Sequence, residues 1–123
     1  MTTVLYVEDN PANLALVENI IDIMDGFSLL TALNAEEGIE IAIEQQPDII
    51  LLDINLPGMN GFEALDVLTS KPETQDIPLI AVTANAMPDD VEKGKASKFK
   101  AYITKPIDIM KLINVLNKYV AER

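Results

Sequence analysis

Short apolar runs alternate with amphipathic segments along the chain. Residues 4–7, 49–52 and 79–82 are almost wholly apolar and rich in β-branched side chains. Continuous apolar runs of this length are typical of strands that are covered on both faces of a sheet. Two weaker runs, at residues 27–31 and 101–104, predict further strands that lie nearer the sheet edges.

Between these runs, apolar residues recur at helical spacing. The first such segment has Asn10 as its expected N-cap, Pro11 in its first turn and Gly26 just beyond its end. The second is expected to begin at Asn34, with Glu37 as its capping-box partner. The helical positions predicted to be buried are Leu14, Val17, Ile20, Ile21, Met24, Ile39, Ala42, Ile43, Phe62, Leu65, Leu68, Ile109, Leu112, Ile113, Leu116 and Val120.

Segment 89–98 predicts a weaker helix, because Gly94 lies inside it and few apolar residues form a face. We therefore expect it to shift more readily than the other helices. Five strands alternating with five helices predict an α/β fold of parallel βαβ units. Right-handed crossovers and the chain length favour a doubly wound (βα)5 fold, a five-stranded parallel sheet in the order 2-1-3-4-5. A ligand is then expected at the carboxyl ends of the strands.

Composition narrows the range of functions. The 123 residues are enough for a single domain over residues 1–123, and 49% of them are apolar. The absence of Cys and His excludes the usual zinc sites, disulfides and catalytic Ser–His or Cys–His pairs. A formal net charge of −11 argues against direct binding of nucleic acid. No segment resembles a membrane span or a secretory signal, so we expect a cytoplasmic protein without membrane contact.

The residues that carry chemistry stand where the predicted strands end. Glu8 and Asp9 follow the first strand, and Asp53 ends the third. Thr83 ends the fourth strand, and Lys105 closes the fifth. Because parallel strands bring their carboxyl ends to one edge of a sheet, these five side chains are expected to converge there.

Three carboxylates gathered at one edge need a compensating charge. At a separation of about 5 Å and an effective dielectric of about 20, each pair repels by roughly 3 kcal/mol. A hard divalent cation relieves this repulsion, and Mg²⁺ is the usual ion where a phosphoryl group is also bound. Glu8 and Asp9 are its natural ligands, and Asp53 is the natural phosphoryl acceptor. The metal, the Lys105 ammonium and the Thr83 hydroxyl would then cover the phosphoryl oxygens.

These residues resemble the response-regulator receiver domain of two-component phosphorelays. The resemblance rests on Glu8-Asp9, residues 53–61 (DINLPGMNG), Thr83 and residues 103–106 (ITKP). Most relatives have Asp-Asp where this chain has Glu-Asp. The resemblance extends over essentially the whole chain and implies a stand-alone receiver of the DivK kind, with no output domain. Such a protein is a phosphoacceptor regulator rather than an enzyme, because it catalyses only its own phosphorylation and slow autodephosphorylation.

The resemblance also implies a ligand set and a phosphoryl donor. Asp53 would receive the phosphoryl group from a histidine of a sensor histidine kinase or of a phosphotransfer protein. Mg²⁺ would be held by Asp9, Asp53, the backbone carbonyl of Asn55 and, often through water, Glu8.

A switch is implied as well. Thr83 and Tyr102 would be the switch pair, in which the hydroxyl turns toward the phosphoryl group and the aromatic ring moves inward. A cis peptide bond before Pro106 would aim the side chain of Lys105 into the site. Partner contacts are then expected on the weak helix 89–98, on Tyr102 and on the last helix, in a protein that is a monomer or a weak dimer.

Other functions fit the residues less well. A phosphatase of the haloacid dehalogenase type needs a second Asp two residues after the nucleophile, where this chain has Asn55. A flavodoxin-like flavin carrier needs a phosphate-binding loop after the first strand, where the acidic pair would repel phosphate. A receiver that works without phosphorylation tends to lose the acceptor or the lysine, and both are present. A calcium loop beginning at Asp53 would need Glu at its twelfth position, which is Ala64.

Overall fold

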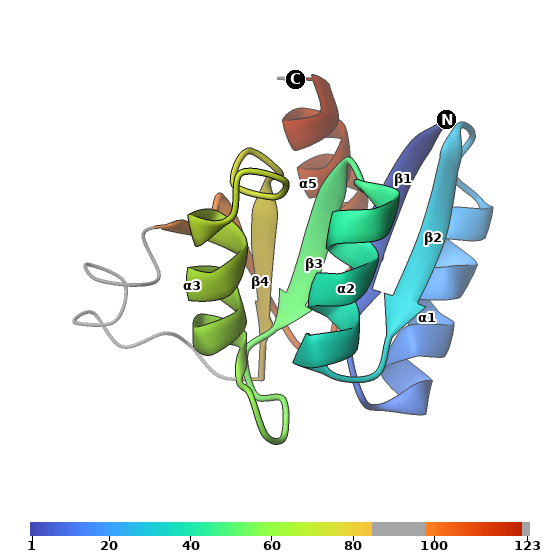
Figure 1. Ribbon diagram of the computed structural model, residues 1–123. Coiled ribbons are helices and arrows are strands. Elements are labelled where there is room, and N and C mark those ends of the chain that lie inside the picture. Colours follow the sequence, from blue (N-terminus) through green and yellow to red (C-terminus); the bar gives the residue numbers. More distant parts are fainter. Residues whose placement is uncertain (85–97, 122–123) are drawn as a thin grey trace.

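The computed structural model describes residues 1–84 and 98–121 of the chain. In that part, five parallel strands form one sheet in the order β2-β1-β3-β4-β5, with helices on both faces (Figure 1). The elements are β1 (Thr2–Val7), α1 (Pro11–Asp22), β2 (Phe27–Ala32), α2 (Ala35–Gln45), β3 (Ile49–Asp53), α3 (Gly61–Ser70), β4 (Leu79–Thr83), β5 (Ala101–Thr104) and α5 (Ile109–Ala121). The predicted strand order is therefore confirmed, while nearly all of the predicted helix 89–98 lies outside the described residues.

Each face of the sheet carries its own apolar core. Side chains alternate along β1, so that Val4 and Tyr6 pack against α1 and α5, while Leu5 and Val7 pack against α2 and α3. All five residues of β3, the central strand, are buried. This explains why its sequence is continuously apolar up to Asp53. Among the described helices, none is long and apolar enough to cross a bilayer.

Asparagine side chains cap three helices at the edge of the sheet where the strands end. Asn10 accepts hydrogen bonds from the backbone N–H groups of Ala12 and Asn13 at the start of α1. Asn34 accepts one from Glu37 in α2, so both N-caps are as predicted, but of the capping box predicted for Asn34 and Glu37 only this bond is observed. A third cap, Asn60, forms a full capping box at the start of α3. These caps fix where each helix begins, close to the carboxyl ends of the strands.

Several helical positions differ from the predicted pattern of burial. Helix α2 packs against the sheet through small residues, Ala35, Gly38 and Ala42, whereas the predicted Ile39 and Ile43 are half-buried. A Cβ atom on Gly38 would lie 2.6 Å from Cγ2 of Val7, so the helix approaches β1 too closely for a larger side chain. In the first turn of α5, Ile109 is exposed, although it was predicted to be buried. Other predicted positions that are half-buried are Leu14, Met24, Phe62 and Ile113.

Gly61, at the start of α3, is pressed against the end of β3. A Cβ atom there would lie 2.6 Å from Cα of Ile54 and 2.8 Å from the backbone oxygen of Asp53. We expect Gly61→Ala to lower the free energy of unfolding by about 2–3 kcal/mol, because backbone atoms cannot rotate out of the way. Urea denaturation measures the loss.

Gly58→Ala is the matched control for this prediction. Gly58 has a φ of +73°, but no atom lies within 4 Å of the position that the alanine methyl would take, so only backbone strain opposes alanine. That strain costs about 1 kcal/mol. An equal or smaller loss in Gly61→Ala than in Gly58→Ala would contradict the close approach.

Candidate functional site

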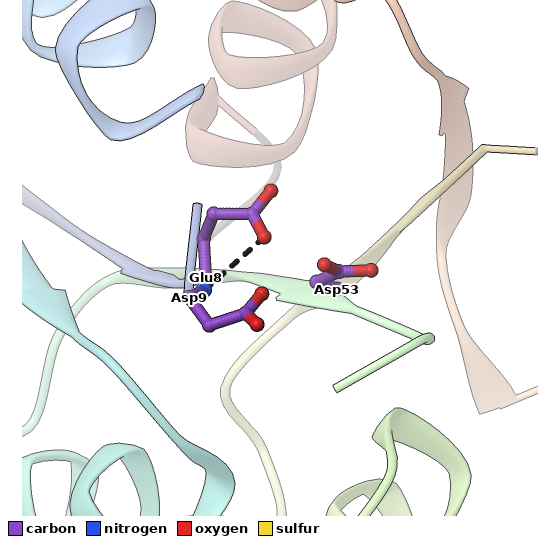
Figure 2. A group of neighbouring side chains, drawn as sticks. All are labelled: Glu8, Asp9 and Asp53. Carbon is purple, nitrogen blue, oxygen red and sulfur yellow. Dashed lines mark hydrogen bonds between the residues drawn. The ribbon is translucent and has the colours of Figure 1, made fainter. Parts of the chain in front are cut away.

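Three carboxylates meet at the carboxyl ends of the two central strands. Val7 of β1 is opposite Leu52 of β3, so the residues that follow them, Glu8 and Asp53, are level with each other. Glu8, Asp9 and Asp53 each offer a carboxylate oxygen, and these three atoms lie within 4.8 Å of one another. Figure 2 shows Glu8 and Asp9 together beside the end of one strand and Asp53 beside the end of the next. The predicted convergence of the acidic residues is therefore present in the structure.

Lys105 supplies the positive charge of the cluster. Its Nζ lies 2.7 Å from Oε1 of Glu8 and 3.1 Å from Oδ2 of Asp53. The peptide bond between Lys105 and Pro106 is cis, as the family resemblance implied. With Asp9 included, three carboxylates and one ammonium leave a net charge of −2, which one divalent cation would neutralise.

Glu8 is completely buried and has an unusually full set of donors. Its Oε1 accepts hydrogen bonds from the Tyr6 hydroxyl at 2.8 Å and from Nδ2 of Asn13 at 3.1 Å, in addition to the Lys105 ammonium. Its Oε2 accepts the backbone N–H of Asp9 at 3.1 Å. Tyr6 and Asn13 were not predicted as site residues. The spacing of Tyr6 and Glu8 was a usable signal, because residues two apart on a strand point to the same face.

Burial and charge set the ionisation of the two buried carboxyls. Burial, followed by the hydrogen bond to Glu8, raises the pKa of Asp53 to about 6, against hydrogen bonds from the Asn55 N–H and Lys105. Burial also opposes ionisation of Glu8. However, its hydrogen bonds to Asp53, Lys105 and Tyr6 outweigh burial and lower the pKa of Glu8 to about 2. When the pair holds one proton, that proton therefore belongs to Asp53.

The two donors that face Glu8 keep their protons at neutral pH. Burial would lower the pKa of the Lys105 ammonium, but its bonds to Glu8 and Asp53 raise that pKa above its usual value. Burial, followed by the charge of Glu8, raises the pKa of the Tyr6 hydroxyl far above its ordinary value. Tyr6 is therefore a neutral hydrogen-bond donor and Lys105 a cation.

The remaining predicted residues occupy the same edge or the strands beside it. The backbone N–H of Asn55 donates to Oδ1 of Asp53 at 3.0 Å. Thr83 is buried at the end of β4, and its carbonyl accepts the N–H of Lys105 at 2.7 Å. Tyr102 is half-buried on β5, and its ring meets Phe99 edge-to-face at 6.1 Å between centroids. Tyr102 and Thr83 belong to the side of the sheet that α2 and α3 cover.

Comparisons with known proteins give a consistent result. Residues 4–117 match the family model of the response regulator receiver domain. The polar-differentiation response regulator DivK of Brucella anthropi is 37% identical over 120 residues, which are 98% of this chain and 97% of that protein. Protein PilH of Pseudomonas aeruginosa is 35% identical over 121 residues, covering 98% of this chain and 99% of that protein.

A solved structure adds a feature of the site. The receiver domain of a sensor histidine kinase from Pseudomonas aeruginosa has a TM-score of 0.87 with this chain at 26% identity. The match covers 98% of both chains. That structure has a magnesium ion coordinated in its active-site cleft.

Removing the Lys105 ammonium should destabilise the protein strongly in metal-free buffer. Lys105→Met leaves Glu8 and Asp53 buried side by side without their cation. We expect a loss of about 3 kcal/mol in the free energy of unfolding, as for other buried ion pairs that lose one partner. The matched control is Lys98→Met, which breaks the exposed pair with Asp66 and should cost less than about 1 kcal/mol. Equal losses in the two variants, measured by urea denaturation, would contradict the buried-pair interpretation.

The raised pKa of Asp53 predicts a pH dependence in metal-free buffer. The folded protein takes up a proton at Asp53 near pH 6, whereas the unfolded chain does so near its ordinary value of about 4. Protonation therefore stabilises the wild type as pH falls through this window, and Asp53→Asn lacks the effect. We therefore expect the free energy of unfolding of the wild type to rise by about 2 kcal/mol relative to that of Asp53→Asn between pH 7.5 and pH 4.5.

The pH window avoids interference from Glu8. Its lowered pKa costs stability only as pH falls from about 4.3, the unfolded value, toward about 2. Urea denaturation of both variants at several pH values, with a chelator present, measures the difference. A constant difference across the window would show that Asp53 does not hold the proton.

Proposed function

The chain belongs to the response regulator receiver family, and from this membership we propose that Asp53 is its phosphoryl acceptor and that Mg²⁺ binds beside it. Receiver domains are phosphoacceptor regulators of two-component signalling, and they interact with histidine kinases or phosphotransfer proteins. The observation that carries the proposal is the contact of Asp53 with Lys105 within the three-carboxylate cluster.

The donor set of the cluster suits Mg²⁺. It consists of oxygen atoms alone, which a hard divalent cation prefers, and its net charge of −2 matches one such ion. Asp9 is exposed, so an ion can reach the cluster from solvent. We propose that Asp9, Asp53 and the Asn55 carbonyl hold Mg²⁺, with Glu8 contributing directly or through water. Bound there, Mg²⁺ would offset the negative charge of a transferring phosphoryl group.

The chain's own residues then divide the work of phosphoryl transfer. A carboxylate oxygen of Asp53 forms the new bond to phosphorus while the bond from phosphorus to the donor nitrogen breaks, and its electron pair returns to the imidazole. The chain has no histidine, so this donor belongs to a partner. The Lys105 ammonium is close enough to follow the negative charge from Asp53 onto the phosphoryl oxygens. Attack of water on the same phosphorus would later release phosphate and restore the carboxylate of Asp53.

We further propose that phosphorylation alters a partner-binding surface through Thr83 and Tyr102. Both residues lie toward the face of α2 and α3, on the adjacent strands β4 and β5. This supports a path from the phosphoryl group to the half-buried ring of Tyr102. The protein would then be a phosphoacceptor regulator that catalyses only the phosphorylation of its own Asp53 and its slow autodephosphorylation.

The wider setting of the protein is proposed on the same basis. We propose one domain over residues 1–123 that works in the cytoplasm, where histidine kinases draw their phosphoryl group from ATP. A net charge of −11 supports partners other than nucleic acid. Among the described residues, the exposed large apolar side chains come from several separate segments, which supports a monomer or a weak dimer. They are Met1, Ile23, Leu33, Ile109 and Met110.

Phosphorylation of Asp53 can be tested directly with a small-molecule donor. Incubation with acetyl phosphate and Mg²⁺ should add one phosphoryl group to the wild type, and a chelator should prevent the addition. Asp53→Asn should gain none, because an amide cannot form the acyl phosphate. Intact-mass spectrometry measures the product.

Asp25→Asn is the matched control for this experiment. Asp25 is an exposed carboxylate in the turn after α1, at the opposite end of the sheet, so its loss should leave the mass gain unchanged. An undiminished gain in Asp53→Asn, or no gain in the wild type, would refute Asp53 as the acceptor.

A further inference from the structure

The hydroxyl of Tyr6 donates to Oε1 of the buried Glu8 carboxylate, whereas the backbone N–H of Asp9 donates to Oε2. We propose that Tyr6 is a positioning residue of the phosphoryl-transfer site, because it holds one oxygen of Glu8 and thereby directs the other oxygen toward the metal. This inference rests on the proposed function. Among the hydrogen bonds of the described residues, Tyr6 bonds to Glu8 and not to Asp53, so its effect on the site would be indirect.

The bond from Tyr6 to Glu8 is sealed from solvent. Both residues have 0% of their surface exposed, and the hydroxyl lies 2.8 Å from Oε1 of Glu8. The Tyr6 ring belongs to the apolar core between the sheet and helices α1 and α5. Water therefore cannot take the place of the hydroxyl when it is removed, and Oε1 would lose this donor outright.

The two oxygens of Glu8 have different surroundings. Oε1 accepts from the Tyr6 hydroxyl, from Nδ2 of Asn13 and from the Lys105 ammonium, at distances of 2.8, 3.1 and 2.7 Å. Because a carboxylate oxygen has two lone pairs, three donors fill it. Oε2 accepts none of these three donors and instead accepts the Asp9 backbone N–H at 3.1 Å. Oε2 is therefore the oxygen of Glu8 that can serve a metal ion or its bound water.

This division keeps two functions of Glu8 apart. Oε1 holds the Lys105 ammonium beside Asp53, and Oε2 would serve the metal. Without the Tyr6 hydroxyl, the Glu8 carboxylate has less to fix its orientation, and the ammonium and the metal would compete for the same oxygens. Groups that orient metal-binding carboxylates typically affect metal affinity by 10- to 100-fold.

The length of the Glu8 side chain matches the reach of Tyr6. The two residues lie two apart on one strand face, where the tyrosine hydroxyl stands well above the sheet. Glutamate carries its oxygens one methylene farther from the backbone than aspartate does. In Glu8→Asp the carboxylate would stop short of the hydroxyl, so Tyr6 should then contribute nothing to metal binding.

The first experiment compares Tyr6→Phe with the wild type in the full chain. Isothermal titration calorimetry with MgCl₂ should show about tenfold weaker binding in Tyr6→Phe, at the low end of such effects because Asn13 and Lys105 still hold Oε1. The Mg²⁺ concentration at which phosphorylation by acetyl phosphate reaches half of its maximal rate should rise by a similar factor. Unchanged or tighter Mg²⁺ binding would overturn the proposal.

Tyr119→Phe is the matched control. Its hydroxyl also donates one hydrogen bond, to the Lys100 carbonyl at 2.7 Å. Lys100 directly precedes β5, so this bond lies at the end of the sheet opposite the acidic cluster. The Mg²⁺ affinity of this variant should equal that of the wild type. Equal losses of affinity in Tyr6→Phe and Tyr119→Phe would assign the effect to general destabilisation and overturn the proposal.

A double-mutant cycle separates positioning from packing. In the Glu8→Asp background, Tyr6→Phe should leave Mg²⁺ affinity unchanged, because the hydroxyl no longer reaches its acceptor. The same fold-loss in both backgrounds would overturn the proposal. If Tyr6→Phe does not fold, Asn13→Ala takes its place, because it removes a half-buried donor to the same oxygen of Glu8. About threefold weaker Mg²⁺ binding would support the proposed separate roles of the two Glu8 oxygens, and unchanged binding would overturn them.

The outcome also distinguishes this inference from the proposed function. If the wild type neither binds Mg²⁺ nor gains a phosphoryl group, the proposed function fails. If the wild type does both and Tyr6→Phe matches it in Mg²⁺ affinity, the proposed function stands and only the role of Tyr6 is refuted.

Discussion

The ammonium of Lys105 between two buried carboxylates is the interaction on which the site depends. Glu8 and Asp53 are almost completely buried, and each would repel the other strongly at this distance without a cation between them. One lysine cannot balance three carboxylates, so the cluster keeps a net negative charge. A divalent cation would balance that charge, as proposed for Mg²⁺. Without a metal, burial together with the neighbouring Glu8 raises the pKa of Asp53 and favours a proton there.

The parallel sheet makes this concentration of charge possible. Consecutive β-strands run in the same direction, so residues distant in sequence end at one edge, where they face solvent on one side and an apolar core on the other. The capped amino ends of α1, α2 and α3 lie at the same edge, and their free N–H groups favour negative charge. The apolar strands below the site hold the carboxylates in place, while the exposed Asp9 leaves a way in for an ion.

The sequence was sufficient to predict the sheet order and the residues at its edge, but not the contacts among them. Asp53 was identifiable because a charged residue directly after a continuous apolar run has no role in the core. Tyr6 was missed, because an aromatic residue within such a run is usually a packing residue. Its spacing from Glu8 becomes informative only once Glu8 is known to be buried beside it. The prediction for α2 was incomplete for a related reason, because Ile39 packs against the core but is only half-buried, and Gly38 makes the close approach. Periodicity gives the direction of a helix face, but the distance of closest approach, which here admits only Gly38, is a property of the packed structure.

Residues from both faces of the sheet contribute to the proposed phosphoryl site, so a change at Asp53 could affect both sides of the sheet. Glu8 and Tyr6 point to the side of α1 and α5, and Lys105 contacts Glu8 there. Thr83 and Tyr102, in contrast, belong to the side of α2 and α3. A group added to Asp53 would draw the Lys105 ammonium on the first side and face Thr83 across the end of β4 on the second. Packed cores shift between discrete arrangements rather than deforming smoothly, and Tyr102 is only half-buried. The proposed switch would use this property, because a small displacement at this edge would then change the position of the Tyr102 ring.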